Sequence, residues 1–524
     1  MTRRTLIAGL ALALVAAALP ATASAAGCPA RVSPAQFDSK RWLRGLNALE
    51  SRLGPRPTGS AAQARFVAAL ERRMKAIPGV RVRSIRYRIS RWDASATRLR
   101  VGSANLPVAG PVPYAEPTPA AGVTAPLVYL PIGTAITAAN AAGRIVVREP
   151  LPGRVALAVF GPQLLGIFTW DPGRTIDPGE RYERDFLANP QPELEAAAEA
   201  GAAGLIFMRD QPRSQARGHY APYEGLQWEV PALYLGADES ARLREAIAAG
   251  AGATATVTIR ARRRPVTTRT LLATLPGRRS QRLVVESHTD GVNAIWDNGP
   301  VSMVAMARYL ARLPRRCRER TVQFAFVTGH LYQHLTGPRV RDGGAEQIAQ
   351  RLDRAYDRGG VAAVIVLEHL GAREWERRPR AGGPGQVLRL SGRSELMLVA
   401  ISRSDALRRE VRRVVVRHDL RRHALIDGAD FPPPGTVPPR CSFGGEGGPY
   451  NKHLLPTVAA IAAPATLFDP AFGLEGVDFR LMRRQTIAFT ELARRLDGMS
   501  RAAIAGDVTR FRRQRAEGAP TCPA

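Results

Sequence analysis

The sequence predicts an α/β protein with a mostly parallel central sheet flanked by helices, and a smaller α/β domain inserted into it. Three observations support this fold class. From Thr270 onward, short apolar segments alternate with amphipathic ones, as strands alternate with helices. Within this part, Val361–Leu367 is apolar throughout, as expected of a strand covered on both faces. Residues 118–262 have short strands and helices of their own, with one histidine, His219, and no cysteine.

The N-terminus has the three parts of an export signal. Arg3 and Arg4 form a positively charged start, residues 6–19 are largely apolar, and small residues end the segment at Ala25. We therefore expect residues 1–25 to be a signal peptide and the mature protein to be secreted or to lie at the exterior of the cell envelope. No later stretch approaches the roughly 18 apolar residues of a membrane span, so we expect no transmembrane segment in the mature protein.

The rest of the chain is expected to divide into three parts, because 524 residues are too many for one core. Residues 26–117 form the N-terminal part of the main domain, with two helices between 39 and 77 and a half-exposed strand over 80–90. Residues 118–262 form the inserted domain, and residues 263–524 complete the main domain. Further strands are expected over 127–129, 143–147, 155–160, 204–208, 231–235, 253–260, 270–275, 283–285, 321–327, 361–367, 396–401 and 457–461, and further helices over 193–200, 238–249, 301–313, 344–356 and 478–496.

The chain is strongly basic, with 75 lysines and arginines against 45 acidic residues and a formal charge of +30. Only Lys40, Lys75 and Lys452 are lysines, and the arginines are spread through every segment. We interpret arginine as the usual surface cation of this chain and expect no specific nucleic-acid binding. A surface for anionic polymers is an alternative, and its binding would depend steeply on salt. The oligomeric state cannot be read from the sequence.

Four cysteines are present, and export would permit them to form disulfides. Four cysteines allow three pairings. We expect Cys28–Cys522, which would join the two termini, and Cys317–Cys441 within the main domain. None of the four has the spacing of a metal site.

Side chains that bind metals follow the ends of several expected strands. They are His288, Asp290, Asp297, His330 and Glu368, and a glycine-rich loop adds Glu446. Because ligands bind at the carboxyl ends of the strands in an open α/β sheet, we expect these side chains to converge there. Imidazoles and carboxylates around an open position make a catalytic zinc site. Zinc would polarise a carbonyl and lower the pKa of its bound water to about 7.

Several of these residues also have a structural interpretation. Asp290 lies two residues after His288, where its carboxylate could orient the imidazole ring. Asp297 could cap the following helix as well as bind metal. Glu368 ends an apolar strand, where an unpaired carboxylate is costly. His369 should face away from Glu368 in an extended strand.

The run from Leu283 to Asp290, followed by Asp297-Asn298-Gly299, resembles the metal-binding signature of the secreted co-catalytic zinc exopeptidases. This is metallopeptidase family twenty-eight, which includes aminopeptidase Y and glutamate carboxypeptidase II. Residues 54–59 are similar to its N-terminal Gly-Pro-Arg-x-x-Gly stretch, and residues 118–262 resemble the protease-associated (PA) domain often inserted in these enzymes. The resemblance implies a zinc-dependent aminopeptidase or related exopeptidase that hydrolyses peptide bonds by metal-activated water. It also implies a PA-like domain that serves substrate access or partner contact.

The resemblance also implies roles for individual residues. His288, Asp297 and Glu368 match ligands of the first metal, and Asp290 matches the carboxylate that orients the histidine. The Glu-Glu pair of the family is replaced by His330 and Leu331, and its last histidine ligand falls near Gly447, beside Glu446. Leucine cannot bind zinc, so we expect one ion rather than two, with His330 as general base and Glu446 as a substitute ligand. The alternative is an inactive relative that binds peptides or a partner protein.

Overall fold

The computed structural model of the chain describes residues 28, 31–151, 153–157, 167–250, 253–337, 340–427, 435–441 and 443–522. The expected signal peptide and the second half of the strand expected over 155–160 lie outside these residues. In the described part of the chain, no helix combines the length and the apolar character needed to cross a membrane.

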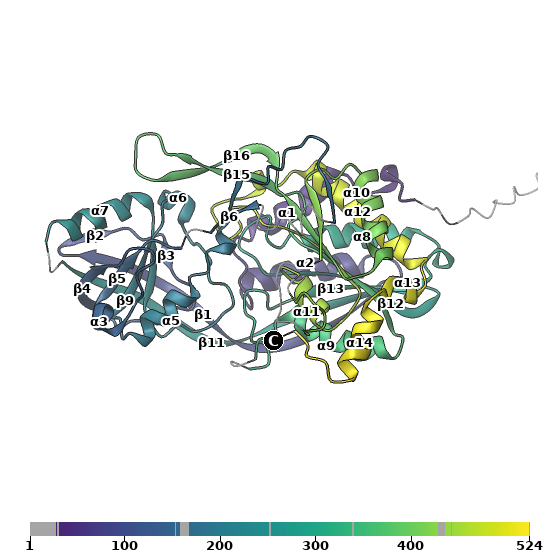
Figure 1. Cartoon of the computed structure of the whole chain (residues 1–524), viewed down its shortest axis with the longest axis horizontal. Coiled ribbons are helices and arrows are strands. Elements are labelled where there is room, and N and C mark those ends of the chain that lie inside the picture. The colour runs from purple at the N-terminus through teal and green to yellow at the C-terminus, as the bar shows by residue number, and fades with distance from the viewer. Residues whose placement is uncertain are drawn as a thin grey trace, which may run out of the picture.

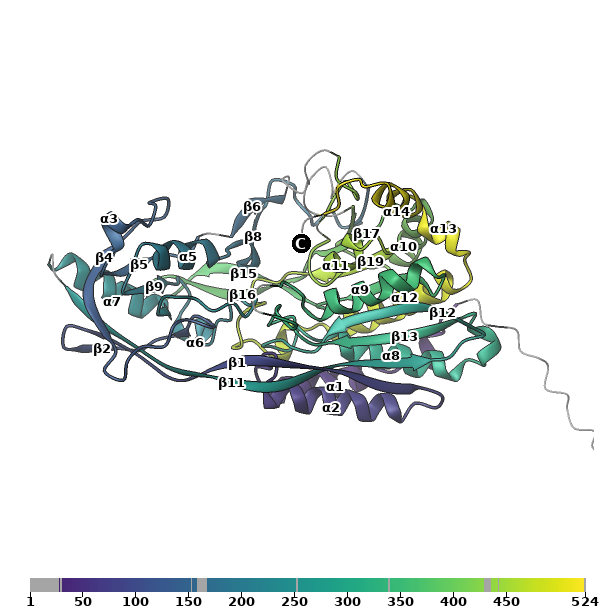
Figure 2. The same cartoon turned by 90° about the horizontal axis from the view of Figure 1, so that it is seen from below.

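Two bodies of the molecule are joined by a pair of very long strands (Figure 1). Strands β1 (Arg81–Val101) and β11 (Thr254–Leu275) run antiparallel from the inserted domain into the main domain, and Figure 2 shows them side by side. The strands expected over 253–260 and 270–275 are therefore parts of one strand. The separate assignment was wrong because β1 pairs with β11 along almost its whole length, so the polar residues between the two apolar runs stay in the ladder. The boundary expected after residue 262 falls inside β11.

Strands β12, β13, β14 and β19 form the parallel centre of the sheet. The long sheet has the order β3-β10-β9-β5-β4-β11-β13-β12-β14-β19-β17-β18-β7. Strand β1 pairs with β11, and β2 pairs with β1. The other strands are β2 (Ala104–Leu106), β3 (Gly110–Pro111), β4 (Val123–Tyr129), β5 (Ile145–Arg148), β6 (Arg154–Ala156), β7 (Phe168–Trp170), β8 (Arg181–Glu183), β9 (Gly204–Met208), β10 (Ala232–Leu235), β12 (Arg279–His288), β13 (Arg320–Val327), β14 (Val361–Leu367), β15 (Arg373–Pro379), β16 (Gln386–Ser394), β17 (Met397–Ile401), β18 (His423–Ile426) and β19 (Thr457–Ala462). The predicted α/β class with a mostly parallel central sheet is confirmed.

Helices cover both faces of this centre, and four further helices of the described residues, those between residues 118 and 262, belong to the inserted domain. They are α1 (Lys40–Arg52), α2 (Ala61–Lys75), α3 (Ala138–Ala141), α5 (Gln191–Glu199), α6 (Arg213–Ala216), α7 (Ala237–Ala248), α8 (Gly299–Arg312), α9 (Gly344–Asp357), α10 (Asp405–Arg417), α11 (Gly447–Lys452), α12 (Phe479–Asp497), α13 (Arg501–Ala505) and α14 (Val508–Ala516). Helices α1, α2, α8 and α12 share one hydrophobic core, and α9 and α11 lie over a second core. The two helices expected between residues 39 and 77 are confirmed.

The alternation of side chains along β12 decides which face the candidate site occupies. Leu283 and Val285 point into the core beneath α8, whereas Val284 points into the core beneath α9. Because successive side chains of a strand face opposite ways, Glu286 and His288 lie on the same face as Val284. The site is therefore built on the face of the sheet that α9 and α11 cover.

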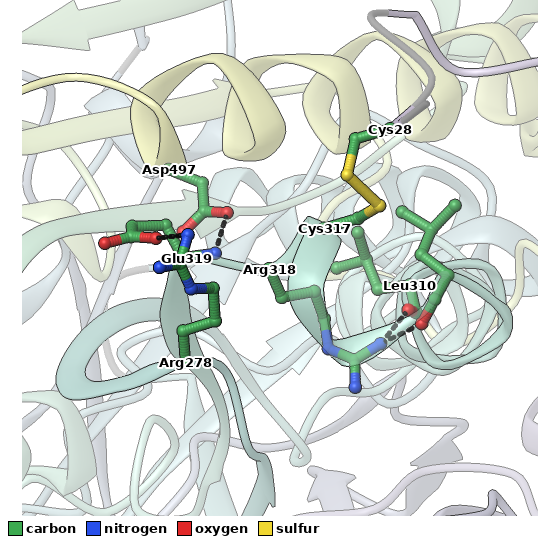
Figure 3. The surroundings of a disulfide bond; sticks show 8 residues. Cys28, Arg278, Leu310, Cys317, Arg318, Glu319 and Asp497 are labelled. Atoms are coloured by element: carbon green, nitrogen blue, oxygen red, sulfur yellow. Dashed lines mark hydrogen bonds and ion pairs between the residues drawn. A yellow bond between two sulfur atoms is a disulfide. The ribbon is translucent and has the colours of Figure 1, made fainter. Parts of the chain in front are cut away.

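The disulfides differ from the expected pairing. They join Cys28 to Cys317, with Cα atoms 5.2 Å apart, and Cys441 to Cys522, with Cα atoms 5.3 Å apart. Figure 3 shows the first, near Asp497 at the end of α12, whose carboxylate accepts a hydrogen bond from the backbone N–H of Glu319. The expectation of Cys28–Cys522 and Cys317–Cys441 was wrong because the termini do not meet. The N-terminal segment packs at the end of α8, and the C-terminal segment pairs with the loop around Val437.

Candidate metal centre

Three strand ends and one loop deliver polar side chains to one edge of the parallel sheet. His288 is the last residue of β12, His330 follows β13 by three residues, and Glu368 follows β14 directly. Glu446 precedes α11, which leads back into β19. Potential ligand atoms of His288, His330 and Glu368 lie within 4.8 Å of one another, and all three side chains are buried. The sequence-predicted residues Asp290, Asp297 and Glu446 lie around this group but are not members of it.

His288 and Glu368 present unpaired atoms to each other. The Nε2 atom of His288 and the Oε2 atom of Glu368 are 3.5 Å apart, and neither has a hydrogen-bond partner among the described residues. His288 and Glu368 are 0% and 1% exposed. Two ligand atoms at zinc distance and at a tetrahedral angle would lie roughly 3.4 Å apart. The pair therefore fits a zinc ion on the geometry of its own atoms.

The ring of His330 lies over the ring of His288, with centroids 4.0 Å apart and planes inclined by 15°. The lone pair of an imidazole nitrogen lies in the plane of its ring. Because the two rings are stacked, the lone pairs of His288 and His330 do not converge on one point. His330 Nδ1 donates a hydrogen bond to the Glu446 carboxylate. This leaves Nε2 as the ring nitrogen of His330 that can accept a proton.

The loop that carries Glu446 is fixed against Glu368. The backbone N–H of Glu446 donates to Glu368 Oε1 at 2.9 Å. Gly445 precedes it with φ +55°, and a Cβ atom there would overlap the Glu368 carboxylate. Glycine therefore allows this close approach, and Glu446 connects the two halves of the site through one contact to His330 and another to Glu368.

Asp290 acts through different atoms from those expected. His288 Nδ1 donates to the backbone carbonyl of Asp290 at 2.8 Å, not to its carboxylate. The carboxylate accepts hydrogen bonds from the backbone N–H groups of Gly329, at 3.1 Å, and Leu331, at 3.0 Å. The expectation that the Asp290 carboxylate orients His288 was wrong in this respect, because that carboxylate instead fixes the loop that carries His330.

Asp297 is committed to an arginine. Arg56 donates from Nε to Oδ2 at 2.9 Å and from Nη2 to Oδ1 at 2.5 Å, so both carboxylate oxygens of Asp297 are engaged. Glu50 lies on the other side of the guanidinium, 3.2 Å from Nη2. Burial would raise the pKa of Asp297, but Arg56 lowers it below its usual value. Both oxygens of Asp297 are thus bound to Arg56, and Asp297 is not among the residues whose ligand atoms converge, so its expected role as a ligand stays a prediction.

The opposed effects of burial and charge also set the protonation of the central pair. Burial would lower the pKa of His288, but the carboxylates of Glu368 and Glu446 outweigh it and raise that pKa to about 9. Burial would raise the pKa of Glu368, yet His288 and His369 bring it below its usual value. At neutral pH the two side chains therefore form a buried imidazolium–carboxylate pair, and a bound cation would take the place of the His288 Nε2 proton.

Glu286 also lies beside the carboxylates of this site, and the sequence analysis did not identify it. It is fully buried on β12, and neither carboxylate oxygen has a hydrogen-bond partner among the described residues. Burial and the nearby Glu446 and Glu368 raise its pKa well above the usual value. The available signal was an acid that directly follows the apolar run over residues 283–285.

The inserted domain reaches the site through an aromatic side chain. Tyr223 stacks on the His330 ring with centroids 5.3 Å apart and also contacts Trp296 and Phe468. Backbone hydrogen bonds fix this segment, from Tyr220 to the Phe468 carbonyl at 2.9 Å and from Gln333 to the Glu224 carbonyl at 2.8 Å. Nothing in the sequence around Tyr223 indicated this contact.

A second cluster of histidine and carboxylates lies where the inserted domain meets the main domain. Asp185, His219 and Asp469 also bring ligand atoms within 4.8 Å of one another. Arg209 fills this cluster, donating to His219 Nε2 at 2.7 Å and to Asp185 Oδ2 at 2.8 Å. His219 Nδ1 in turn donates to Asp469 at 2.7 Å. The polar atoms of His219 are thus satisfied without an ion.

Comparison with known proteins identifies the fold of the chain but not its family. No protein-family model matches the sequence, and no curated protein does. A zinc aminopeptidase from Bacillus subtilis matches with a TM-score of 0.60 and 15% identity over 90% of this chain and 99% of that one. A peptidase M28 precursor from Shewanella amazonensis has a TM-score of 0.60 and 15% identity over 89% and 95% of the two chains. An aminopeptidase from Aneurinibacillus has a TM-score of 0.53 and 15% identity over 88% and 95%. The chain therefore has the fold of zinc aminopeptidases.

Proposed function

We propose that this protein is a zinc-dependent exopeptidase that uses a single ion. The observation that carries the proposal is that His288 Nε2 and Glu368 Oε2 face each other 3.5 Å apart in a fully buried pocket, and neither has a hydrogen-bond partner among the described residues. The shared fold with zinc aminopeptidases supports it, as does the sequence resemblance to metallopeptidase family twenty-eight. Peptides are the substrate class that both point to.

His288 and Glu368 are the residues that would hold the ion. When bound, zinc supplies a Lewis acid that polarises the peptide carbonyl. Asp297 stays with Arg56, where it keeps the loop before α8 in place. Glu446, expected as a substitute ligand, is assigned to orienting His330 because one of its oxygens accepts the Nδ1 proton of that ring.

His330 is assigned the proton transfers. With Nδ1 fixed as a donor to Glu446, its Nε2 accepts the proton of the attacking water and then returns a proton to the departing amine. An imidazole suits both steps because it titrates near neutral pH. Asp290 is assigned a positioning role, since its carboxylate fixes the backbone on both sides of His330.

A catalytically inactive, peptide-binding relative is the second candidate, and one observation favours it. Leu331 occupies the position of the second glutamate of the resembled pair, is fully buried, and has no atom that can bind zinc. The chain therefore lacks at least one ligand of a two-metal site. Hydrolysis of peptides by the wild-type protein decides between the two candidate functions.

The test compares the wild-type protein with His330→Gln and His288→Ala after loading with zinc. Hydrolysis of leucyl peptides and zinc content are measured on the same samples. We expect His330→Gln to keep its zinc and lose at least about a hundredfold in kcat, the usual size of general-base catalysis. Loss of zinc in His330→Gln would show that His330 is a ligand. If the wild-type protein hydrolyses none of the leucyl peptides, the inactive relative is favoured.

We also propose that the protein is exported, and that the inserted domain is PA-like. Both disulfides support export, because disulfides persist in oxidising compartments. The placement of Tyr223 against His330 supports a role for the inserted domain in substrate access. Sequencing the N-terminus of the protein recovered from the medium or the envelope tests export.

A further inference from the structure

A cleft of about 310 Å³ leads away from His330 and Glu446. Five of the residues that line it are glycines, namely Gly329, Gly343, Gly444, Gly445 and Gly448. Walls without side chains allow a ligand backbone to lie close to the protein backbone. Tyr223 closes one side, and the Cys441–Cys522 disulfide closes another.

Two cations line the cleft beyond these walls. Arg341 donates from Nε to Gln333 Oε1 at 2.7 Å, and in the described part of the chain it has no ion-pair partner. Lys452 lies 3.7 Å from Glu346, a distance too long for a hydrogen bond, with its side chain 25% exposed. Both residues therefore have N–H donors available to a ligand.

The carboxylates that line the same cleft are occupied by other groups. Glu346 accepts hydrogen bonds from His453 Nε2 at 2.6 Å and from Gln350 at 3.0 Å. Asp353 and Glu346 outweigh the effect of burial and raise the pKa of His453, which favours the protonated imidazole beside Glu346. Glu446 is bound to His330. Lys452 therefore shares Glu346 with His453, and Arg341 is the cation of the cleft that has no ion pair among the described residues.

The length of α11 sets the distance between the reacting centre and these cations. Glu446 caps the start of α11, and Lys452 is its last residue, six positions later. At about 1.5 Å per residue the two backbones are roughly 9 Å apart along the helix. An extended peptide advances about 3.3–3.6 Å per residue. A group held by Lys452 therefore lies about two residues from the bond that is cleaved.

We propose that Arg341 and Lys452 form a subsite for a substrate carboxylate, so that the preferred substrates are short peptides with a carboxylate about two residues from the cleaved bond. This deepens the proposed function and rests on it. The carboxylate can be the free C-terminus of a tripeptide or the side chain of an acidic residue. Both share the chemistry that a guanidinium and an ammonium recognise.

The experiment uses two matched pairs of peptides. Leu-Gly-Gly and its C-terminal amide test the terminal carboxylate, and Leu-Glu-amide and Leu-Gln-amide test an acidic side chain. For at least one pair we expect the acid to be favoured about tenfold or more in kcat/KM, mainly through KM. This preference should fall toward one in the double variant Arg341→Gln and Lys452→Gln, and should persist in Arg480→Gln, which removes an exposed arginine elsewhere.

Calorimetry with the same peptides and the His330→Gln protein separates this inference from the proposed function. Tighter binding of the acid than of its amide, lost in the double variant, supports the subsite even if no peptide is hydrolysed. Equal binding of acid and amide in both pairs overturns it, even if peptides are hydrolysed well. A preference that survives in the double variant also overturns it, because the carboxylate is then recognised elsewhere.

Discussion

Among the described residues, two groups of histidine and carboxylate bring their potential ligand atoms together, and they differ in how their hydrogen bonds are satisfied. Around His219, Arg209 supplies the positive charge and satisfies the imidazole and Asp185 directly. Around His288, the arginine of the neighbourhood is Arg56, and it is bound to Asp297 rather than to His288 or Glu368. In the first cluster, side chains of the protein satisfy the hydrogen bonds of the histidine. In the second, His288 Nε2 and Glu368 Oε2 have no hydrogen-bond partner among the described residues. The comparison shows that ligand-type residues at short distance do not define a metal site until their hydrogen bonds are counted.

The largest expected difference between the two clusters concerns zinc. His288→Ala removes one of two ligands and should weaken zinc binding at least about a hundredfold, since even partners of ligands are worth 10–100-fold. His219→Ala should leave zinc affinity within about twofold. Titration with zinc in competition with a chelator of known affinity measures both. If His219→Ala weakens binding as much as His288→Ala, the distinction between the clusters is lost.

The next effect concerns the stability that each arginine provides. Arg56→Met leaves Asp297 buried and unpaired, so it should lower the free energy of unfolding by about 3–5 kcal/mol. Arg209→Met should cost less, because Arg377 still donates to Asp185 at 3.0 Å. Urea unfolding followed by tryptophan fluorescence measures this. Only Arg56→Met should also alter zinc binding, because Asp297 leads into α8 beside the site. A loss below about 1 kcal/mol in both variants would contradict the account.

A smaller expected effect is the dependence of the free energy of unfolding on pH, which involves the cluster around His219. Burial and Arg209 together lower the pKa of His219 below 6.5, so the ring is neutral in the folded protein. The unfolded chain takes up this proton as the pH falls below about 6.5, and the folded chain does not. The stability contributed by His219 is therefore present above pH 6.5 and is lost as the pH falls toward the folded pKa. His219→Gln should flatten the fall in stability between pH 7 and pH 5, and an unchanged slope would argue against a neutral His219.

The sequence allowed the arrangement of strands to be predicted, but not all the contacts between side chains. The apolar runs before His288, His330 and Glu368 indicated parallel strands, and strand order then placed these residues at one edge. The pairing of Asp297 with Arg56 could not be read from the sequence, because the two are separated by 241 positions. The same holds for Tyr223, which comes from the inserted domain. The long β1–β11 pair was divided in the prediction because its middle is polar and exposed.

The most direct test of the central claim is anomalous diffraction at the zinc absorption edge from crystals of the zinc-loaded protein. One peak is expected, within bonding distance of His288 Nε2 and Glu368 Oε2, and none at His219. A peak at His219, or none at His288 under saturating zinc, would contradict the account.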